Sequence, residues 1–384
     1  MLKLLLVHNY YKSTNIGGED VVFNSELELL RNKLGERNVI AYHVSNEEMN
    51  LFTTLLNAIF SFKHYFKIKK IIKKNKIDLV HVHNFFPKLS PSVFIAAKHA
   101  NVKVVHTLHN YRLWCISGTF FRGNSICEDC VGKTIPFKGV INKCYRNSYF
   151  QSLVTQSLFW FYKSSNYFES IDFFFVLTEF QRNKVLNLGI NRHKIFLKPN
   201  AVPFFKQTDV SSRRGYIYIG RFEKSKGVEN LLEQWVKLDS KFHLTLVGNG
   251  VDFIECKRKY SRANIIFMGK CNRSETQKIL SNHKYLIQPS LWYETFGLTI
   301  LEAMSKGVPV IGTNIGTRKE FIKDNINGFL YDNNNFNEVI QNSYNFDKYD
   351  ILSNNSSLTS KKFLSDTIME KQIEIYSKII SPNV

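Results

Sequence analysis

Two glutamates stand eight positions apart in the stretch LWYETFGLTILEAM, residues 291–304. Glu294 precedes the helix predicted from Leu298 onward, and Glu302 lies one turn inside it. Eight helical residues span about 12 Å, so the two carboxylates cannot form an adjacent acid–base pair. The spacing predicts that they touch different parts of one long ligand, whose anionic part the free amides of the helix start could bind. An ordinary exposed helix residue is the simpler interpretation of Glu302 taken alone.

A basic loop, GRFEKSKG, occupies residues 220–227 between a predicted strand ending at Gly220 and a helix starting near Val228. Such loops lie at the carboxyl edge of a parallel sheet, where these folds bind ligands. Arg221 can hold two phosphate oxygens at once, and Lys226 adds a mobile point charge. The pair therefore fits a diphosphate, and a solvated basic turn is the alternative.

A glycine pair occurs in NIGGED, residues 15–20, just before a helix predicted from Glu19 to Leu34. Gly17 and Gly18 would let the backbone approach a phosphate or an acceptor closely. For the acidic residues Glu19 and Asp20 we favour interaction with the helix dipole over a role in acceptor binding.

Histidines accompany two further strands. His81 and His83 in HVHN share one face of a strand and could suggest a metal, but the sequence offers no acidic third ligand nearby. We therefore favour a pocket or packing role for both. His109 stands at the end of the strand VVHTLHN, and the chain contains no Asp-x-Asp motif.

Four cysteines lie in an insertion at about residues 111–150 that is rich in polar residues and glycine: Cys115, Cys127, Cys130 and Cys144. One Cys-x2-Cys pair favours a structural zinc ion, which would supply folding energy to a segment without its own core. Unligated thiols, another cluster and a disulfide remain as alternatives.

Short apolar strands alternate with helical patterns, which predicts two Rossmann-like, doubly wound α/β domains facing a central cleft. We expect an N-terminal acceptor domain at 1–200, a C-terminal donor domain at 201–358, and a last helix within 359–384 that packs on either domain, with a return to the first as one option. Residues 198–215 resemble a linker. Strands are expected near 3–8, 38–44, 78–83, 103–109, 172–177, 194–197, 215–220, 242–248, 264–269, 284–290 and 308–312.

The chain is basic, with 52 Lys and Arg against 32 Asp and Glu, which suggests an anionic partner. Residues 60–76 carry seven lysines among Phe, Tyr and Ile, and such a helix either lies on an anionic membrane or packs on the sheet. No recognition motif for nucleic acid accompanies the charge. No apolar run is long enough to span a bilayer, so we expect a cytoplasmic protein, peripheral at the inner face of the plasma membrane.

The motifs GRFEKSKG and LVGNG, with the pair Glu294-x7-Glu302, resemble retaining glycosyltransferases of the GT-B fold, in the large family four. The resemblance covers nearly the whole chain. It implies that Glu302 holds the ribose of a nucleotide and that Glu294 contacts the donor sugar. It also implies that backbone amides steady the sugar and the phosphate, at Phe296, Gly297 and Leu298.

The resemblance further implies that Arg221 and Lys226 neutralise the diphosphate leaving group, which is catalytic because charge builds there as the glycosidic bond breaks. His109 would contact the donor sugar near the reaction centre. No catalytic metal is expected. The cysteine pattern resembles a subgroup from bacterial surface-polysaccharide pathways.

The expected reaction is transfer of a sugar from a nucleotide-diphosphate sugar to a hydroxyl of a lipid-linked saccharide acceptor, with retention of configuration. Two alternatives come from other classes: a nucleotide-sugar epimerase of the same fold, and a non-catalytic protein that binds membrane or nucleic acid. The base, the sugar, the acceptor and the linkage are left open.

Overall fold

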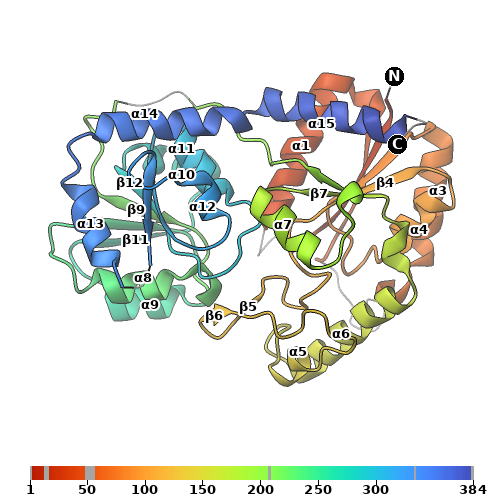
Figure 1. Cartoon of the computed structure of the whole chain (residues 1–384), viewed down its shortest axis with the longest axis horizontal. Helices are drawn as coiled ribbons and strands as arrows, with labels where there is room; N and C mark the ends of the chain where they lie inside the picture. The colour runs from red at the N-terminus through yellow and green to blue at the C-terminus, as the bar shows by residue number, and fades with distance from the viewer. Residues whose placement is uncertain (1, 13–16, 48–56, 206–208, 333, 382–384) are drawn as a thin grey trace. The chain divides into compact units, whose positions relative to one another are not determined.

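A computed structural model describes residues 2–12, 17–47, 57–205, 209–332 and 334–381 (Figure 1). Asn15 and Ile16 of the predicted glycine loop, and residues 206–208 of the predicted linker, lie outside these ranges. The chain forms two compact units. Unit 1 comprises Met1–Gly118, Glu128–Ala201 and Ser365–Val384, and unit 2 comprises Thr119–Cys127 and Val202–Leu364.

Unit 1 is built on a six-stranded parallel sheet with the strand order β2-β1-β3-β4-β7-β8. Its strands, which confirm those predicted for the first half of the chain, are β1 (Leu4–Tyr10), β2 (Val39–Ser45), β3 (Leu79–Val82), β4 (Lys103–Thr107), β7 (Phe173–Val176) and β8 (Ile195–Leu197). The strand order reverses between β1 and β3, because the chain adds β2 on one side of β1 and the remaining strands on the other.

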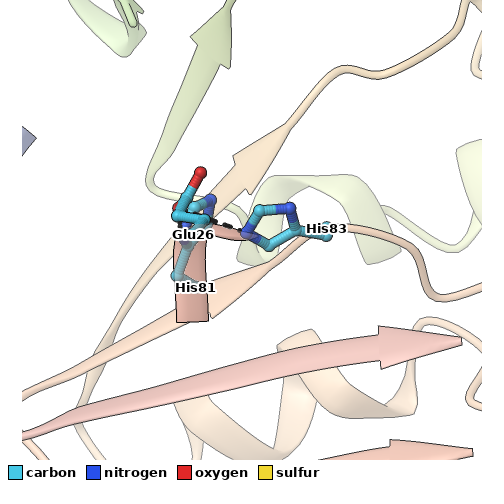
Figure 2. A group of neighbouring side chains, drawn as sticks. All are labelled: Glu26, His81 and His83. Atoms are coloured by element: carbon cyan, nitrogen blue, oxygen red, sulfur yellow. Dashed lines mark ion pairs between the residues drawn. The ribbon is translucent and has the colours of Figure 1, made fainter. Parts of the chain in front are cut away.

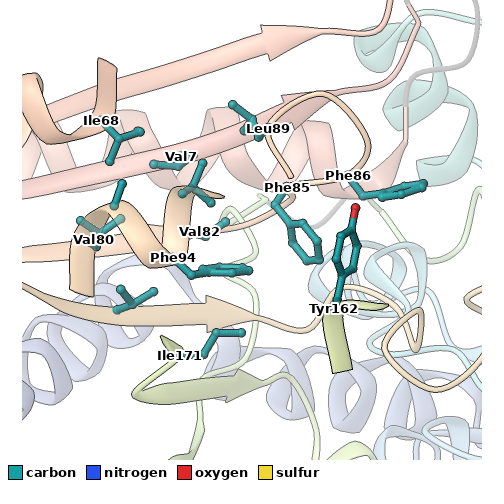
Figure 3. Packing of buried hydrophobic residues seen from close by; sticks show 14 of the residues in the cluster. Val7, Ile68, Val80, Val82, Phe85, Phe86, Leu89, Phe94, Tyr162 and Ile171 are labelled. Atoms are coloured by element: carbon teal, nitrogen blue, oxygen red, sulfur yellow. The ribbon is translucent and has the colours of Figure 1, made fainter. Parts of the chain in front are cut away.

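Both faces of this sheet are buried, which is why its strands are almost continuously apolar. Leu5 and Val7 of β1 point into one cluster, while Leu4 and Leu6 point into another, as the two-residue period of a strand requires. Figure 3 shows the first cluster, in which Ile68 packs near the strand valines Val7, Val80 and Val82.

The helices of unit 1 have the following bounds: α1 (Gly18–Leu34), α3 (Phe62–Asn75), α4 (Ser92–Lys98), α5 (Lys138–Ile141), α6 (Tyr149–Ser164), α7 (Glu179–Asn187) and α15 (Ser365–Ile380). The C-terminal helix α15 belongs to unit 1 and packs Ile368 and Met369 into the same cluster as Phe23 of α1. The sequence had left open which domain this helix joins.

Unit 2 is a second six-stranded parallel sheet with the order β11-β10-β9-β12-β13-β14, the classical doubly wound arrangement of dinucleotide-binding folds. Its strands are β9 (Tyr216–Ile219), β10 (Leu244–Val247), β11 (Ile265–Gly269), β12 (Tyr285–Gln288), β13 (Val310–Thr313) and β14 (Gly328–Tyr331). The sequence did not predict β14, and the short antiparallel pair β5 (Phe121–Arg122) and β6 (Ser125–Ile126) was also missed.

The helices of unit 2 have the following bounds: α8 (Val228–Trp235), α9 (Phe253–Tyr260), α10 (Arg273–Ser281), α11 (Leu298–Ser305), α12 (Arg318–Phe321), α13 (Phe336–Tyr344) and α14 (Tyr349–Ser360). The apolar stripe predicted for α8 is buried at Val228, Leu231, Leu232 and Trp235. Within the described part of the chain, no helix combines the length and the apolar character that crossing a bilayer requires.

Candidate functional site

The strand order of unit 2 reverses between β9 and β12, and in doubly wound sheets ligands bind beyond the carboxyl ends of the strands at this point. The loop 220–227 follows β9, and the loop 289–297 follows β12. Parallel pairing of β9 with β12 therefore brings Arg221, Lys226 and Glu294 to one edge of the sheet, although 68 positions separate Lys226 from Glu294.

The centre of this edge is an ion pair between Lys226 and Glu294, whose Nζ and Oε1 atoms lie 2.7 Å apart. The same carboxylate oxygen accepts hydrogen bonds from Ser290 Oγ and Trp292 Nε1, each at 2.9 Å. The Lys226 ammonium also lies 4.9 Å from the centre of the Trp292 ring, within the range of a cation–π contact. The lysine is thus held beside a carboxylate and an aromatic face, with 18% of its side chain exposed.

A buried arginine, which sequence reasoning missed, supports the Glu294 loop. Arg318 is fully buried, and its Nη2 donates to the backbone oxygens of Ser290 at 2.8 Å and Trp292 at 3.2 Å. Thr317 Oγ1 donates to the backbone oxygen of Glu294 at 2.7 Å. The loop after β12 is therefore positioned by residues that follow β13, and only their place at the end of a predicted strand could have pointed to them.

The charges around Glu294 favour its ionised form. Burial alone would raise the pKa of Glu294, but the Lys226 ammonium, the Arg318 guanidinium and the Ser290 hydroxyl more than offset it, so the pKa lies below its usual value. Burial lowers the pKa of Arg318 to about 10, despite the nearby Glu294 carboxylate, so its guanidinium stays charged at neutral pH.

Glycine is required where the site loops approach one another. Gly227 has φ of +67°, and a Cβ there would lie 2.1 Å from the backbone oxygen of Pro289 in the facing loop. Gly248, in the LVGNG motif after β10, has φ of +138°, and its Cβ would lie 1.9 Å from the backbone oxygen of Gly220. A side chain at Gly227 would push apart the loops that carry Lys226 and Glu294, and one at Gly248 would push the loop after β10 away from the loop that carries Lys226.

The other predicted residues of this edge have separate partners. Arg221 is half exposed, and its Nη2 lies 3.1 Å from Glu223 Oε1. Glu302, on α11, contacts Arg273 Nη2 at 3.2 Å and Gln277 Nε2 at 3.3 Å, both from α10. Burial raises the pKa of Glu302, and these two partners offset the rise only in part.

At the start of α11, backbone amides rather than side chains are available to a ligand. Gly297 caps the helix with φ of +87°, and Leu298 is its first residue. The Phe296 ring is buried edge-on against Phe321, with ring centres 5.4 Å apart, so only its peptide group remains to serve a ligand. The use of the amides at these three positions by a ligand stays a prediction.

In unit 1 the strand order reverses between β1 and β3, and the glycine pair lies beyond β1. Asp20 accepts a hydrogen bond from the Gly17 amide through Oδ2 at 3.0 Å, while its Oδ1 lies 2.8 Å from His8 Nε2. Asp20 therefore caps α1, in line with the dipole interpretation. A Cβ at Gly17 would lie 2.9 Å from the Tyr11 ring, whereas one at Gly18 would meet no described atom within 4 Å.

The histidine pair of β3 does have an acidic neighbour, contrary to the expectation from sequence, because helix α1 supplies it. Glu26 Oε1 lies 3.3 Å from His81 Nδ1 and 3.3 Å from His83 Nε2 (Figure 2). The three ligand atoms lie within 4.8 Å of one another, close enough to surround one metal ion. Glu26 is adjacent to these histidines only in the folded sheet–helix layer, so no local residue pattern indicates the contact.

The surroundings of this cluster do not suit a divalent cation. Lys198 Nζ forms an ion pair with Glu26 Oε2, and both side chains are at least 97% buried. His81 Nδ1 already lies 2.6 Å from Tyr376 OH, and its Nε2 lies 2.6 Å from Thr107 Oγ1. A divalent ion would add two positive charges beside a buried ammonium, so the packing interpretation of the histidines is favoured.

His109 extends the cluster toward the sheet edge. Its Nε2 lies 3.0 Å from His83 Nδ1, and the two rings are within 24° of parallel. Burial, followed by the neighbouring charges of His83 and Lys198, holds the pKa of His109 well below its usual value. The residue lines a small pocket beyond β4 together with Asn84, Phe86, Asn110 and Arg112.

The cysteines do not assemble into a ligand set among the described residues, where the one group of three or more candidate ligands is that of Glu26, His81 and His83. Cys115 Sγ lies 3.1 Å from Ser117 Oγ, and Cys130 Sγ lies 3.9 Å from the Pro136 oxygen. Cys115, Cys130 and Cys144 belong to unit 1 and Cys127 to unit 2. The described geometry does not present a tetrahedral site, and the zinc ion stays a prediction.

Two family models match consecutive parts of the chain. The model described as Glycosyltransferase Family 4 matches residues 31–204, and the model described as Glycosyl transferases group 1 matches residues 204–343. The boundary between the two matches falls within three residues of the boundary between units 1 and 2 at Ala201.

Among characterised and uncharacterised relatives, a 41.2 kDa protein in the cps region of Klebsiella pneumoniae is 26% identical over 338 residues, covering 81% of this chain and 84% of its own length. The lipopolysaccharide 1,6-galactosyltransferase of Salmonella typhimurium is 32% identical over 126 residues, covering 30% of this chain and 34% of its own length.

Solved structures share the fold over the whole chain. Sucrose-phosphate synthase from Thermosynechococcus elongatus has a TM-score of 0.71 at 15% identity, covering 98% of this chain and 99% of its own. HepE from Anabaena in complex with UDP-glucose has a TM-score of 0.66 at 14% identity, covering 98% and 100%. The lipopolysaccharide outer core galactosyltransferase WaaB in its apo form has a TM-score of 0.65 at 17% identity, covering 98% and 99%.

Proposed function

This chain belongs to the GT-B glycosyltransferases of group 1 and family 4, and from that premise we propose that it moves a sugar from a nucleotide-diphosphate sugar to a saccharide hydroxyl with retention of configuration. The observation that carries the proposal is the Lys226–Glu294 pair at the strand-order reversal of unit 2. A cation and a carboxylate held at this edge match the two ends of a sugar diphosphate.

The basic groups of the site would act on the leaving group. Lys226 lies at the end of the loop after β9 and Arg221 at its start, so both can reach a diphosphate placed against the α11 amides. Negative charge grows on the diphosphate as the glycosidic bond breaks, and cations fixed in advance stabilise that charge more in the transition state than in the ground state. No separate acid is needed to release such a leaving group.

Carboxylates would hold the remaining parts of the donor. Glu294 accepts hydrogen bonds through Oε1, and its loop is held in place by Arg318. Its carboxylate can therefore bind sugar hydroxyls without rearranging. Glu302, with its separate partners on α10, would hold the ribose. If the departing phosphate takes the proton of the attacking hydroxyl on the same face of the sugar, configuration is retained without a side-chain base.

The acceptor is proposed to be a lipid-linked saccharide at an anionic membrane. The galactosyltransferase relative from Salmonella typhimurium is named for lipopolysaccharide, which supports a place in surface-polysaccharide synthesis. Helix α3 buries Ile68 and Ile72 against unit 1 yet leaves Phe62 and Phe66 more than 60% exposed among its lysines. An apolar rim within a basic face suits peripheral binding to anionic lipid.

The donor site is tested by calorimetric titration of the protein with uridine, guanosine and adenosine diphosphates. Preferential binding of one nucleotide is expected, with at least tenfold weaker binding in Lys226→Ala, since one charge-assisted contact contributes about 1.5 kcal/mol or more. Lys224→Ala is the matched control, because this lysine is exposed in the same loop. Equal binding by both variants would contradict the proposed role of Lys226.

The reaction itself is tested with the sugar nucleotide of the preferred base. Transfer to a saccharide acceptor, with the anomeric configuration of the product read by NMR, is the expected result. Conversion of the donor to another sugar nucleotide without acceptor would favour the epimerase alternative. Binding of vesicles with no binding of any nucleotide would favour the non-catalytic one.

A further inference from the structure

A series of contacting side chains leads from the buried centre of unit 1 to His109. Lys198 pairs with Glu26, Glu26 approaches His83, and His83 contacts His109. The first three are almost completely buried, and His109 alone reaches the edge of the sheet with partial exposure. Catalysis as proposed above uses none of the first three, so their arrangement requires its own explanation.

The protonation of Glu26 is fixed by its surroundings. Burial would raise the pKa of Glu26, but Lys198 and the histidines outweigh it and the pKa lies well below its usual value. The ionised carboxylate has only acceptor atoms. Gln372 Nε2 donates to Oε1 at 2.5 Å and Lys198 binds Oε2, so any further neighbour of this carboxylate must also be a donor.

This requirement determines which nitrogen of His83 carries the proton. Burial lowers the pKa of His83 to about 3, so the ring is neutral and has one N–H group. Its Nε2 is buried without a hydrogen-bond partner among the described residues, and the Glu26 Oε1 atom lies 3.3 Å away. An unprotonated Nε2 would place two acceptors face to face in a buried site, so the proton belongs on Nε2 and the lone pair on Nδ1.

The tautomer of His83 in turn determines that of His109. His83 Nδ1 offers a lone pair, so His109 Nε2, at 3.0 Å, must donate to it. The small angle of 24° between the rings suits an in-plane N–H···N bond, because the N–H and the lone pair both lie in their ring planes. A neutral His109 with its proton on Nε2 carries its lone pair on Nδ1.

We propose that Glu26 is a positioning residue that acts through His83 to hold His109 in the tautomer protonated on Nε2, leaving Nδ1 as its acceptor nitrogen. This inference rests on the proposed function for its consequence: a sugar hydroxyl that meets Nδ1 of His109 must donate the hydrogen bond, because that nitrogen carries no proton. Lys198 holds the Glu26 carboxylate ionised, so the buried Lys198–Glu26 ion pair determines which nitrogen of each ring carries the proton.

The test is NMR of protein labelled with ¹⁵N at histidine, recorded without any sugar nucleotide. His109→Gln and His83→Gln identify the two sets of ring signals. In the native protein both residues are expected to be protonated on Nε2. In Glu26→Gln, Lys198 keeps the amide oxygen and the amide N–H₂ turns to His83, so protonation of both rings should move toward Nδ1. Glu28→Gln, an exposed change on the same helix, should leave both rings unchanged.

A second variant tests the role of the ammonium. Lys198→Met removes the group that holds Glu26 ionised, so thermal stability should fall, and beside a protonated Glu26 the rings of His83 and His109 should no longer be confined to the tautomer protonated on Nε2. A native His109 protonated on Nδ1 or on both nitrogens in exchange overturns the proposal, as does a folded Glu26→Gln with native ring signals. If Glu26→Gln does not fold, the native protein and Lys198→Met still decide.

The catalytic consequence is read separately. Nucleotide binding by Glu26→Gln should match the native protein, because that site lies in unit 2, while kcat should fall by about 10²-fold. Failure of any nucleotide to bind would remove the proposed function but leave the ring signals as the test of the tautomer. An unchanged kcat together with changed tautomers would overturn the role in catalysis.

Discussion

Among the described residues, the Lys198–Glu26 pair of unit 1 and the Lys226–Glu294 pair of unit 2 consist of the same residue types and differ chiefly in burial. In unit 2, Lys226 and Glu294 keep 18% and 10% of their side chains exposed at the sheet edge. In unit 1, Lys198 and Glu26 keep 1% and 3%. The same two residue types therefore stand where a ligand can reach them in one unit and where none can in the other.

The difference shows how burial assigns roles. A sealed pair cannot exchange partners, so it serves as a fixed source of charge and orientation for neighbours such as His83 and His81. A pair at an edge can share its ammonium with an arriving phosphate. Supporting groups differ accordingly: α1, β3 and α15 enclose the first pair, while loops after β9, β12 and β13 position the second.

The largest expected contrast between the units is their response to acid. Burial lowers the pKa of His83 to about 3 and of His64 and His106 to about 4, and it also lowers the pKa values of His81 and His109. Histidines with lowered pKa stabilise the fold above their unfolded pKa, and this stabilisation is lost as pH falls below about 6.5. Each contributes a loss of about 1.4 kcal/mol per pH unit until its folded pKa is reached.

Unit 1 should therefore lose stability before unit 2. The described residues of unit 1 include the five histidines with lowered pKa values named above, whereas in unit 2 burial lowers the pKa of His283. The depressed pKa of Glu26 adds a further loss only below its usual value of 4.5. Hydrogen exchange followed by mass spectrometry between pH 7 and pH 5 resolves the two units separately. Equal loss of protection in both would break the contrast.

Removing one partner of the sealed pair should destabilise more than any single change at the edge pair. Lys198→Met leaves the Glu26 carboxylate buried without its ammonium, and such changes cost about 3–5 kcal/mol. Urea denaturation gives the free energy of unfolding. Lys371→Met, an exposed change on α15, is the control and should stay within about 0.5 kcal/mol of the native protein.

The Lys226–Glu294 pair should contribute more to catalysis than to stability. Lys226→Ala removes the cation proposed to stabilise the diphosphate, so kcat should fall by about 10²–10³-fold. Its stability should change by only about 1 kcal/mol, because the pair is partly solvated and Ser290 and Trp292 still donate to Glu294. Steady-state kinetics and urea denaturation of the same samples give both quantities. A stability loss as large as that of Lys198→Met would abolish the distinction between the pairs.

The glycines of the two edges provide the smallest contrast. Gly227→Ala places a Cβ against Pro289 at a positive φ, so a loss of about 1–3 kcal/mol is expected together with weaker nucleotide binding. Gly18→Ala meets no described atom within 4 Å and should leave stability nearly unchanged. Thermal unfolding measures both. If Gly18→Ala nevertheless lowers kcat, the open space at Gly18 is needed by the acceptor.

The sequence by itself determined the alternating architecture and most of the edge residues. Apolar strands with two-residue periods, and loops such as 220–227 that follow them, depend on neighbours in the chain, so β1, β9 and α8 lie where the pattern predicted. Strand β14, which is no shorter than β9, was not predicted. Arg221, Lys226 and Glu294 were found because strand ends of a parallel sheet share one edge.

Only the tertiary structure decided which of these residues meet. Glu26 comes from the middle of α1, and Lys198 from the end of the last strand of unit 1, yet burial in one layer joins them to the β3 histidines. Arg318 likewise supports Glu294 from beyond another strand. Such contacts depend on the order of strands in the sheet and on helix packing, which combine distant segments, and a local residue pattern carries no record of either.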